Sequence, residues 1–310
     1  MRLVTFTTAN GSPRIGVRVG HRVLDIEAAS RVDGEPLPSS MKALLREGRG
    51  KLSRVQALAK AAQSQAGRFS GAMHEERAIR FLPPVPDLDK FMCVGKNYRA
   101  HLEELKKHDL IKEMPEEVTG FVKLHSCLTG HETKVVKPAV VKHLDYEPEL
   151  VFVIGRRVLG FDKQNEDPWD YVVGVTVLND LTDRDMQKRE VASGSRFWTS
   201  KNAPGFGPVG PEIVTLDEIA DPYDLWMVCA VNGEERMRVN TRDQIWKMGD
   251  ILEHFSRTIP LEPGDMFATG APGGVAVGKP NAEALFLQPG DVVECSIEGI
   301  TTLRNTIVAP

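Results

Sequence analysis

The sequence predicts an α+β protein in which β-structure predominates, with a small N-terminal α+β unit ahead of a larger domain. Short apolar segments bounded by glycine and proline recur along most of the chain, which is typical of strand-rich proteins. Long helical patterns do not alternate regularly with these segments, as they would in a doubly wound α/β sheet. The chain has 310 residues, of which 41% are hydrophobic, so it can bury a sizeable core.

The first 78 residues are predicted to form the small unit. Alternation of apolar and polar residues predicts strands at residues 2–7, 14–19 and 22–26. Apolar residues spaced three and four apart then predict helices at 41–46 and 52–62. Prolines cluster between residues 83 and 86, and proline neither continues a helix nor donates to a sheet. Residues 79–90 are therefore predicted to be a linker.

The larger domain is predicted to comprise residues 91–310. Its candidate strands lie at residues 90–94, 150–154, 171–178, 225–231, 265–269 and 291–297. An apolar stripe predicts a helix at residues 243–257, and Thr241 with Gln244 fits a capping box at its start.

Composition excludes several classes of partner. The formal net charge is only -4, and the longest apolar runs are far shorter than the roughly 18 residues of a membrane span. Neither nucleic acid nor a membrane is therefore expected as a partner. The first residues alternate like a strand rather than forming a secretory signal, so we expect a cytoplasmic protein. The four cysteines are scattered among apolar residues and are expected to be free, buried thiols.

Three carboxylates flank two predicted strands. Glu147 and Glu149 are two residues apart at the start of an apolar strand, so their side chains point to one face. Asp180 follows the next apolar strand. If the three converge, they would bind a hard divalent cation such as Mg²⁺ or Mn²⁺ through oxygen. The spacing alone fits solvated strand ends equally well.

A second candidate pair follows the strand at 90–94. His101 and Glu104 are three residues apart at a helical start, which places them on one helix face. A carboxylate that orients one ring nitrogen leaves the other free to take a proton from water. Surface helices contain such pairs by chance, however, and the spacing alone favours that interpretation.

Two further patterns are weaker. Residues 273–279 match the first seven positions of a phosphate-binding P-loop, but Pro280 replaces the hydroxyl residue that would ligate magnesium. His125, Cys127 and His131 are spaced like soft-metal ligands, but no fourth partner follows at zinc-finger spacing. We interpret both segments as loops.

From residue 83 onward, the order of several motifs resembles the fumarylacetoacetate hydrolase family. The motifs are the blocks at residues 93–101, 146–150, 170–174, 179–187, 207–211 and 261–275. The resemblance implies a mixed β-sandwich or roll as the main domain, a homodimer and a small-molecule oxo-acid substrate. It also implies a bound Mg²⁺ or Mn²⁺, with Ca²⁺ possible in crystals.

The resemblance also assigns roles to single residues. It implies that the metal ligands are Glu147, Glu149 and Asp180, and that the catalytic residues are His101, Glu104 and Lys201. The dyad of His101 and Glu104 would activate water, and Lys201 would steady an oxyanion or enolate. Residues implied to contact the substrate or lie near it are Lys123, Arg184, Gln187 and Thr269. The alternatives are surface salt bridges for Lys123 and Arg184, and capping or core hydrogen bonds for Gln187 and Thr269.

The reaction that the resemblance implies is metal-dependent hydrolysis of a carbon-carbon bond in a β-diketone or 2,4-dioxo acid, such as an acylpyruvate. Decarboxylation, isomerisation or hydration of a 2-oxo acid on the same fold is the alternative. A non-catalytic binding protein is a third. The run Asn202–Gly207 after Lys201 departs from the family's usual sequence, and Val191 stands near the place where eukaryotic fumarylacetoacetases carry a tyrosine. These departures leave the substrate open.

Overall fold

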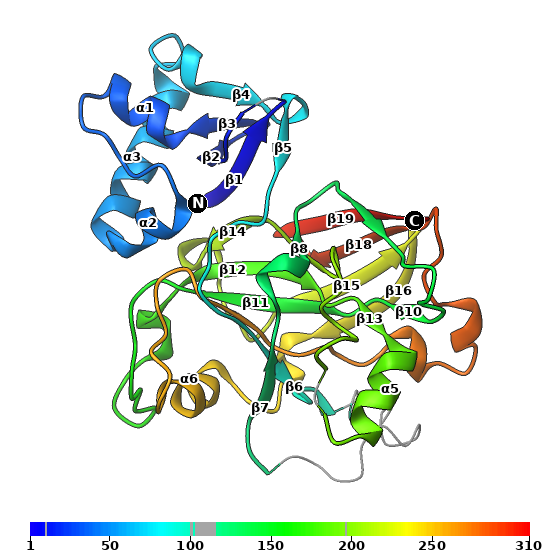
Figure 1. The fold of residues 1–310 in the computed structure, drawn as a ribbon. Coiled ribbons are helices and arrows are strands. Elements are labelled where there is room, and N and C mark those ends of the chain that lie inside the picture. Colours follow the sequence, from blue (N-terminus) through cyan, green and yellow to red (C-terminus); the bar gives the residue numbers. More distant parts are fainter. Residues whose placement is uncertain (10, 100–101, 103–115, 196) are drawn as a thin grey trace.

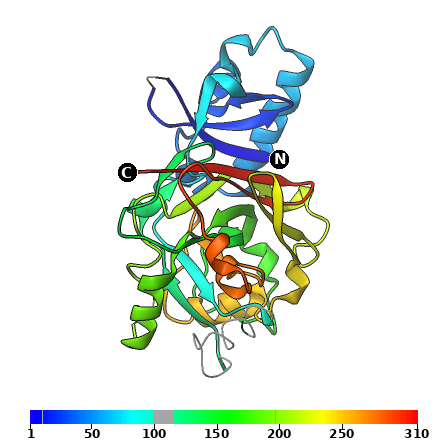
Figure 2. The ribbon, with the colours of Figure 1, turned by 90° about the vertical axis from the view of Figure 1, so that its right-hand side faces the viewer.

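The structure is a computed structural model that describes residues 1–9, 11–99, 102, 116–195 and 197–310. The N-terminal unit lies against one side of a larger β-rich domain, and the C-terminus lies on the side of that domain nearest the unit (Figures 1 and 2). Strands outweigh helices, so the predicted α+β, mostly β fold class is confirmed. Within the described residues, no helix is long and apolar enough to cross a membrane.

The N-terminal unit begins with strands followed by helices, as predicted, and two further short strands that were not predicted follow the helices. Its strands are β1 (Arg2–Thr8), β2 (Arg14–Val19), β3 (Arg22–Asp25), β4 (Met73–Glu75) and β5 (Ile79–Phe81). Its helices are α1 (Ile26–Val32), α2 (Met41–Arg46) and α3 (Arg49–Ser64). Helix α1 was not predicted. It begins where β3 ends because the buried carboxylate of Asp25 accepts a hydrogen bond from Ala28 N at 2.9 Å and caps the helix.

This cap provides a stability prediction. Asp25 also forms an ion pair with Arg14, so Asp25→Ala should lower the free energy of unfolding by about 2 kcal/mol, combining a lost cap with a lost charge-assisted hydrogen bond. Asp25→Asn keeps the capping oxygen and should cost less. Urea unfolding of both variants measures the difference, and equal losses would show that the cap contributes nothing.

The largest sheet among the described residues has 12 strands and runs through both parts of the molecule. Its path is β4-β3-β2-β1-β14-β12-β11-β17-β6-β7, with β5 beside β1 and β8 beside β14. The strands of the larger domain in it are β6 (Phe91–Gly95), β7 (Thr119–Val122), β8 (Leu128–Thr129), β11 (Pro148–Ile154), β12 (Val172–Asn179), β14 (Gly207–Thr215) and β17 (Met266–Ala268). Because β1 pairs with β14, the two parts share one sheet, and their division at residues 79–90 stays a prediction.

The centre of this sheet explains the continuous apolar run in β11. Every residue of β11 is buried, because its two faces line different cores. Leu150, Phe152 and Ile154 belong to the core of the larger domain. Val151 and Val153 belong to the core shared with the N-terminal unit. Strand β12 lies antiparallel beside β11, with Pro148 opposite Asn179. The start of β11 therefore meets the end of β12.

The second sheet packs against this centre and has the order β16-β15-β18-β19-β9. Its strands are β9 (Lys134–Val136), β15 (Trp226–Val231), β16 (Glu234–Asn240), β18 (Val292–Ile297) and β19 (Thr301–Val308). Strands β10 (Leu144–Asp145) and β13 (Thr182–Asp183) form a short antiparallel pair. Helix α5 (Arg184–Ala192), which was not predicted, follows β13.

The predicted helix at 243–257 exists but begins later, as α6 (Met248–Ser256). The predicted capping box of Thr241 and Gln244 is wrong. Thr241 instead donates its hydroxyl to Pro222 O and accepts from Leu225 N, at 3.0 Å each. The first turn of α6 is closed by Asp250, whose carboxylate accepts from Lys247 N at 3.0 Å. The sequence pattern predicts too early a start for α6, because Thr241 resembles a helix cap but forms hydrogen bonds within a loop.

Candidate metal centre

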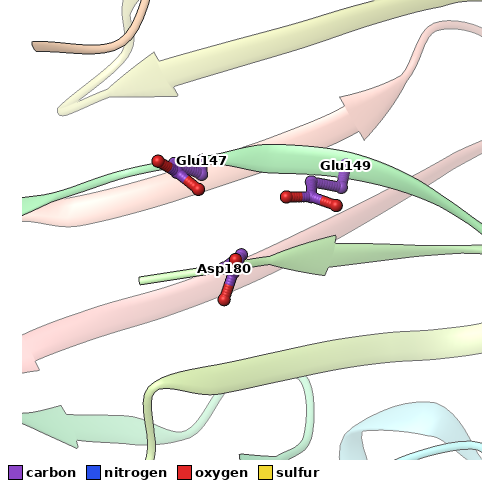
Figure 3. Close-up of side chains that lie close together, drawn as sticks. All are labelled: Glu147, Glu149 and Asp180. Carbon is purple, nitrogen blue, oxygen red and sulfur yellow. The ribbon is translucent and has the colours of Figure 1, made fainter. Parts of the chain in front are cut away.

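Three buried carboxylates meet where β11 starts and β12 ends. Glu147 directly precedes β11, Glu149 is the second residue of β11, and Asp180 directly follows β12 (Figure 3). One oxygen of each lies within 4.8 Å of one oxygen of the others. Their exposed fractions are at most 3%. This burial contradicts the alternative that the three residues are solvated strand ends.

Backbone hydrogen bonds hold the two strand ends together. Asp180 N donates to Glu147 O at 2.8 Å, and Glu147 N donates to the side-chain oxygen of Asn179 at 3.0 Å. The carboxylates of Glu147 and Asp180 therefore start from adjoining backbone positions. Their proximity follows from strand pairing and does not depend on flexible side chains.

Each carboxylate has one oxygen held by a donor from a different part of the chain. Glu147 Oε1 contacts an Arg184 guanidinium nitrogen at 2.6 Å. Glu149 Oε2 accepts from Gly270 N at 2.8 Å. Asp180 Oδ1 accepts from Lys123 Nζ at 2.7 Å. These contacts orient the second oxygen of Glu147 and of Asp180 toward a common point.

Lys201 lies at that point. Its ammonium contacts Glu147 Oε2 and donates to Asp180 Oδ2 at 2.6 Å and to Thr182 Oγ1 at 2.9 Å. Only 3% of Lys201 is exposed. The rings of Phe121 and Phe197 lie 5.4 and 5.9 Å from Nζ, so the ammonium is shielded on that side.

Burial and charge shift the acid-base properties of these groups. Burial is the main cause that raises the pKa of the Glu149 carboxyl well above its ordinary value, and the nearby charge of Asp180 adds to it. Burial acts to lower the pKa of the Lys201 ammonium, but the charges of Asp180 and Glu147 outweigh it and raise that pKa. Lys201 is thus held as a cation, whereas an anionic Glu149 requires further positive charge.

The donor set suits a hard divalent cation. Mg²⁺ and Mn²⁺ prefer carboxylate oxygens, and three of them converge here. A cation would also supply the charge that stabilises an ionised Glu149. The described residues therefore fit a divalent metal, and Glu147, Glu149 and Asp180 are the groups that would hold it.

The other predicted site residues lie around this centre, with two exceptions. Lys123 is fully buried, and its ammonium contacts Asp180, Lys201 O and Phe206 O. Burial thus contradicts the alternative that Lys123 makes a surface salt bridge. Whether it also touches a substrate stays a prediction. His101 and Glu104 are the exceptions, since both lie outside the described residues.

Helix α5 brings Arg184 and Gln187 to the site. Arg184 is 5% exposed, so it is not a surface salt-bridging residue. It donates to Gln187 Oε1 at 2.9 Å and to Asp145 Oδ2 at 2.8 Å. Arg184 and Gln187 thus form one buried polar group beside Glu147.

Thr269 directly follows β17. Its hydroxyl donates to Leu150 O at 3.0 Å, which is the core hydrogen bond that the sequence left open as an alternative. The neighbouring amide of Gly270 holds Glu149. Gly270 was not predicted, because a backbone donor leaves no side-chain signal in the sequence.

The two weaker patterns have structural roles. In the segment that resembles a P-loop, Ala276 N and Val277 N donate to the carboxylate of Asp145 at 2.9 and 3.0 Å. This turn binds an anion of the protein itself. His125 contacts Pro86 O, and His131 Nδ1 accepts from Arg304 N at 3.1 Å. Among the described residues, the triad is the one group of acidic, histidine or cysteine side chains placed to hold a metal.

A mixed β-fold with a buried carboxylate triad at its centre defines a class of candidate metal-dependent enzymes. A sequence profile described as "Fumarylacetoacetate (FAA) hydrolase C-terminal" matches residues 90–308. The chain therefore belongs to the fumarylacetoacetate hydrolase family, as its motifs predicted.

Full-length relatives support this membership. The chain is 33% identical over 311 residues to the mitochondrial oxaloacetate tautomerase fahd2 of Xenopus laevis, covering 99% of this chain and 90% of that protein. It is 33% identical over 291 residues to the oxaloacetate tautomerase YisK of Bacillus subtilis, covering 92% and 93%. The maleylpyruvate hydrolase of Sphingobium sp. SYK-6, solved with manganese(II) and pyruvate, has a TM-score of 0.74 and 28% identity, covering 100% and 99%.

Proposed function

We propose that the chain is a divalent-metal-dependent enzyme that interconverts the enol and keto forms of oxaloacetate or a closely related 2-oxo acid. The observation that carries the proposal is the convergence of Glu147, Glu149 and Asp180 beside the buried ammonium of Lys201. Mg²⁺ or Mn²⁺ is the proposed cofactor. A homodimer in the cytoplasm is the proposed form of the protein.

The chemistry of tautomerisation fits these groups. The reaction breaks the C3–H bond of the keto acid, forms a C2–C3 double bond and places a proton on the C2 oxygen. A divalent cation, when bound, would act as a Lewis acid that polarises the 2-oxo group. Lys201 would stabilise the negative charge that develops on the oxygen. Arg184 and Lys123 would keep the ligand carboxylates in place and ionised.

The names of the relatives favour this proposal over the reaction implied by the sequence motifs. Two relatives that align over 99% and 92% of the chain carry the name oxaloacetate tautomerase. Hydrolysis of a carbon-carbon bond is the second candidate, because a structure with the same fold is named a maleylpyruvate hydrolase. Both reactions pass through an enolate, so the same lysine and carboxylates serve either one.

The test is to follow the enol absorbance of oxaloacetate with metal-free protein, with added Mn²⁺ or Mg²⁺, and after chelation. We expect enol decay to accelerate only when protein and cation are both present. A panel of acylpyruvates, assayed under the same conditions, measures hydrolysis. Cleavage of an acylpyruvate without any effect on enol decay would overturn the proposal in favour of the hydrolase.

His101 provides a prediction that separates the two candidates. Hydrolysis needs an activated water, whereas tautomerisation needs none. His101→Ala should therefore reduce any acylpyruvate hydrolysis about 10²- to 10⁴-fold, the usual range for a lost general base. Tautomerase activity should fall less, and metal binding should survive. Equal losses of both activities would instead make His101 the proton carrier of both reactions.

A further inference from the structure

A buried carboxylate outside the triad is connected to it by one side chain. Asp145, on β10, has no exposed surface. Its Oδ1 accepts from Tyr146 N and Ala276 N, at 2.9 Å each, and its Oδ2 accepts from Val277 N at 3.0 Å. Arg184 adds two contacts to Oδ2, at 2.8 Å from Nε and 2.7 Å from a terminal nitrogen. The carboxylate of Asp145 thus binds both a backbone turn and the guanidinium of Arg184.

The guanidinium of Arg184 continues from Asp145 to the metal centre. The second terminal nitrogen contacts Glu147 Oε1 at 2.6 Å and Gln187 Oε1 at 2.9 Å. A guanidinium is a rigid, planar fork, so fixing its Nε edge on one carboxylate fixes the direction of its far nitrogen. That nitrogen contacts Glu147 Oε1. The other oxygen, Glu147 Oε2, contacts Lys201, which also contacts Asp180.

We propose that Asp145 is a positioning residue, which holds Arg184 so that Glu147 presents a single oxygen, Oε2, to the cation. The inference rests on the proposed metal-dependent function and deepens it. A ligand that offers one oxygen leaves coordination positions for the two oxygens of a 2-oxo acid. If the guanidinium were free to rotate, Glu147 could turn and use both oxygens itself.

The turn of Ala276 and Val277 makes this arrangement dependent on a distant segment. These residues follow Asp145 by more than 130 positions, yet their amides donate to both oxygens of its carboxylate. The carboxylate accepts hydrogen bonds from three backbone amides, so its orientation does not depend on Arg184 alone. The turn therefore orients Asp145, Asp145 orients Arg184, and Arg184 orients Glu147.

Asp265 offers a matched control. It is also a buried aspartate, 1% exposed, that accepts from two backbone amides, of Lys90 at 2.9 Å and Glu262 at 2.7 Å. It also forms one ion pair, with Lys90 Nζ at 2.8 Å. Its backbone oxygen accepts from Ile154 N, at the far end of β11 from the triad. Replacing either aspartate by asparagine removes a similar set of contacts, but only Asp145 leads to Glu147.

The experiment is calorimetric titration of the full chain with Mn²⁺ alone, without substrate. Asp145→Asn should weaken Mn²⁺ binding about 10- to 100-fold, the range for residues that orient a ligand, because an amide NH₂ would face the guanidinium. Asp265→Asn should stay within about twofold of the parent, even if thermal unfolding shows equal destabilisation. Arg184→Met should match Asp145→Asn, and the double variant should lose little more than Arg184→Met alone.

Two outcomes overturn the proposal. One is parent-like Mn²⁺ affinity in folded Asp145→Asn, and the other is additive losses in the double variant. Should Asp145→Asn fail to fold, Arg184→Lys serves instead, because lysine keeps the charge but cannot bridge Asp145 and Glu147. Parent-like affinity in Arg184→Lys would overturn the proposal as well. Failure of the proposed tautomerase would show separately, as a parent that binds Mn²⁺ tightly but leaves the enol of oxaloacetate unchanged.

Discussion

Glu149→Gln is expected to abolish cation binding and turnover while leaving the protein without metal at least as stable as the parent. The amide keeps an oxygen for Gly270 N, so the local backbone contact survives. It removes a carboxyl group whose pKa is raised by burial, and with it the cost that burying an ionisable group imposes on the folded state. The substitution also removes one of three anionic metal ligands. Loss of a residue that only orients a ligand weakens metal binding up to roughly 100-fold, so the loss of Mn²⁺ affinity here should be larger.

The measurements are Mn²⁺ titration, turnover and thermal unfolding in a chelator. Glu212→Gln is the matched control, because Glu212 is also completely buried in the same sheet but pairs with Arg2 and Arg18. Its Mn²⁺ affinity should equal that of the parent. If Glu149→Gln still binds Mn²⁺ like the parent, Glu149 is not a ligand and the triad is a structural cluster.

The strands that carry the site could be predicted because they are continuous and apolar. Residues 150–154 and 171–178 correspond closely to β11 and β12. Acidic residues at the ends of two such strands are the signal that pointed to the triad. Convergence itself depends on the pairing of Pro148 with Asn179, which no local pattern encodes. The family resemblance supplied that step.

Helix α5 could not be predicted in the same way, because it is polar along most of its length and has no apolar stripe. Its start is fixed by Asp183, whose carboxylate accepts from Asp185 N and Met186 N at 3.1 Å each. Strand β14 was missed for another reason. Its sequence, Gly207–Thr215, contains glycines and prolines that normally interrupt strands, yet all nine of its residues are buried.

Asp145 was missed because its role comes only from long-range contacts. In the sequence it is one more acidic residue beside the Tyr146–Leu150 block. Its partners are a turn near residue 276 and the guanidinium of Arg184. In the sequence, this turn shows only an incomplete match to a phosphate-binding loop. Knowledge of the fold is needed to bring the three segments together.

Lys201→Met is expected to lower kcat about 10²- to 10³-fold at saturating Mn²⁺, the usual loss for one group that stabilises a developing oxyanion. If Lys201 only steadied an oxyanion or enolate, as the family resemblance implies, its replacement would leave metal affinity nearly unchanged. The structure alters that expectation. The ammonium contacts Glu147 and Asp180, so its positive charge opposes a cation held by the same carboxylates.

Removing that charge should therefore tighten Mn²⁺ binding while turnover falls. The same change leaves the carboxylates without a neighbouring cation, so the variant should unfold at a lower temperature in a chelator and gain more stability from Mn²⁺ than the parent gains. Calorimetric titration, thermal unfolding with and without Mn²⁺, and kcat at saturating Mn²⁺ measure the three effects.

Unchanged kcat with tighter Mn²⁺ binding would make Lys201 a counter-ion of the ligands and remove it from the reaction. Weaker Mn²⁺ binding would show instead that Lys201 is needed to assemble the carboxylates, because their mutual repulsion would then outweigh the charge that the lysine contributes.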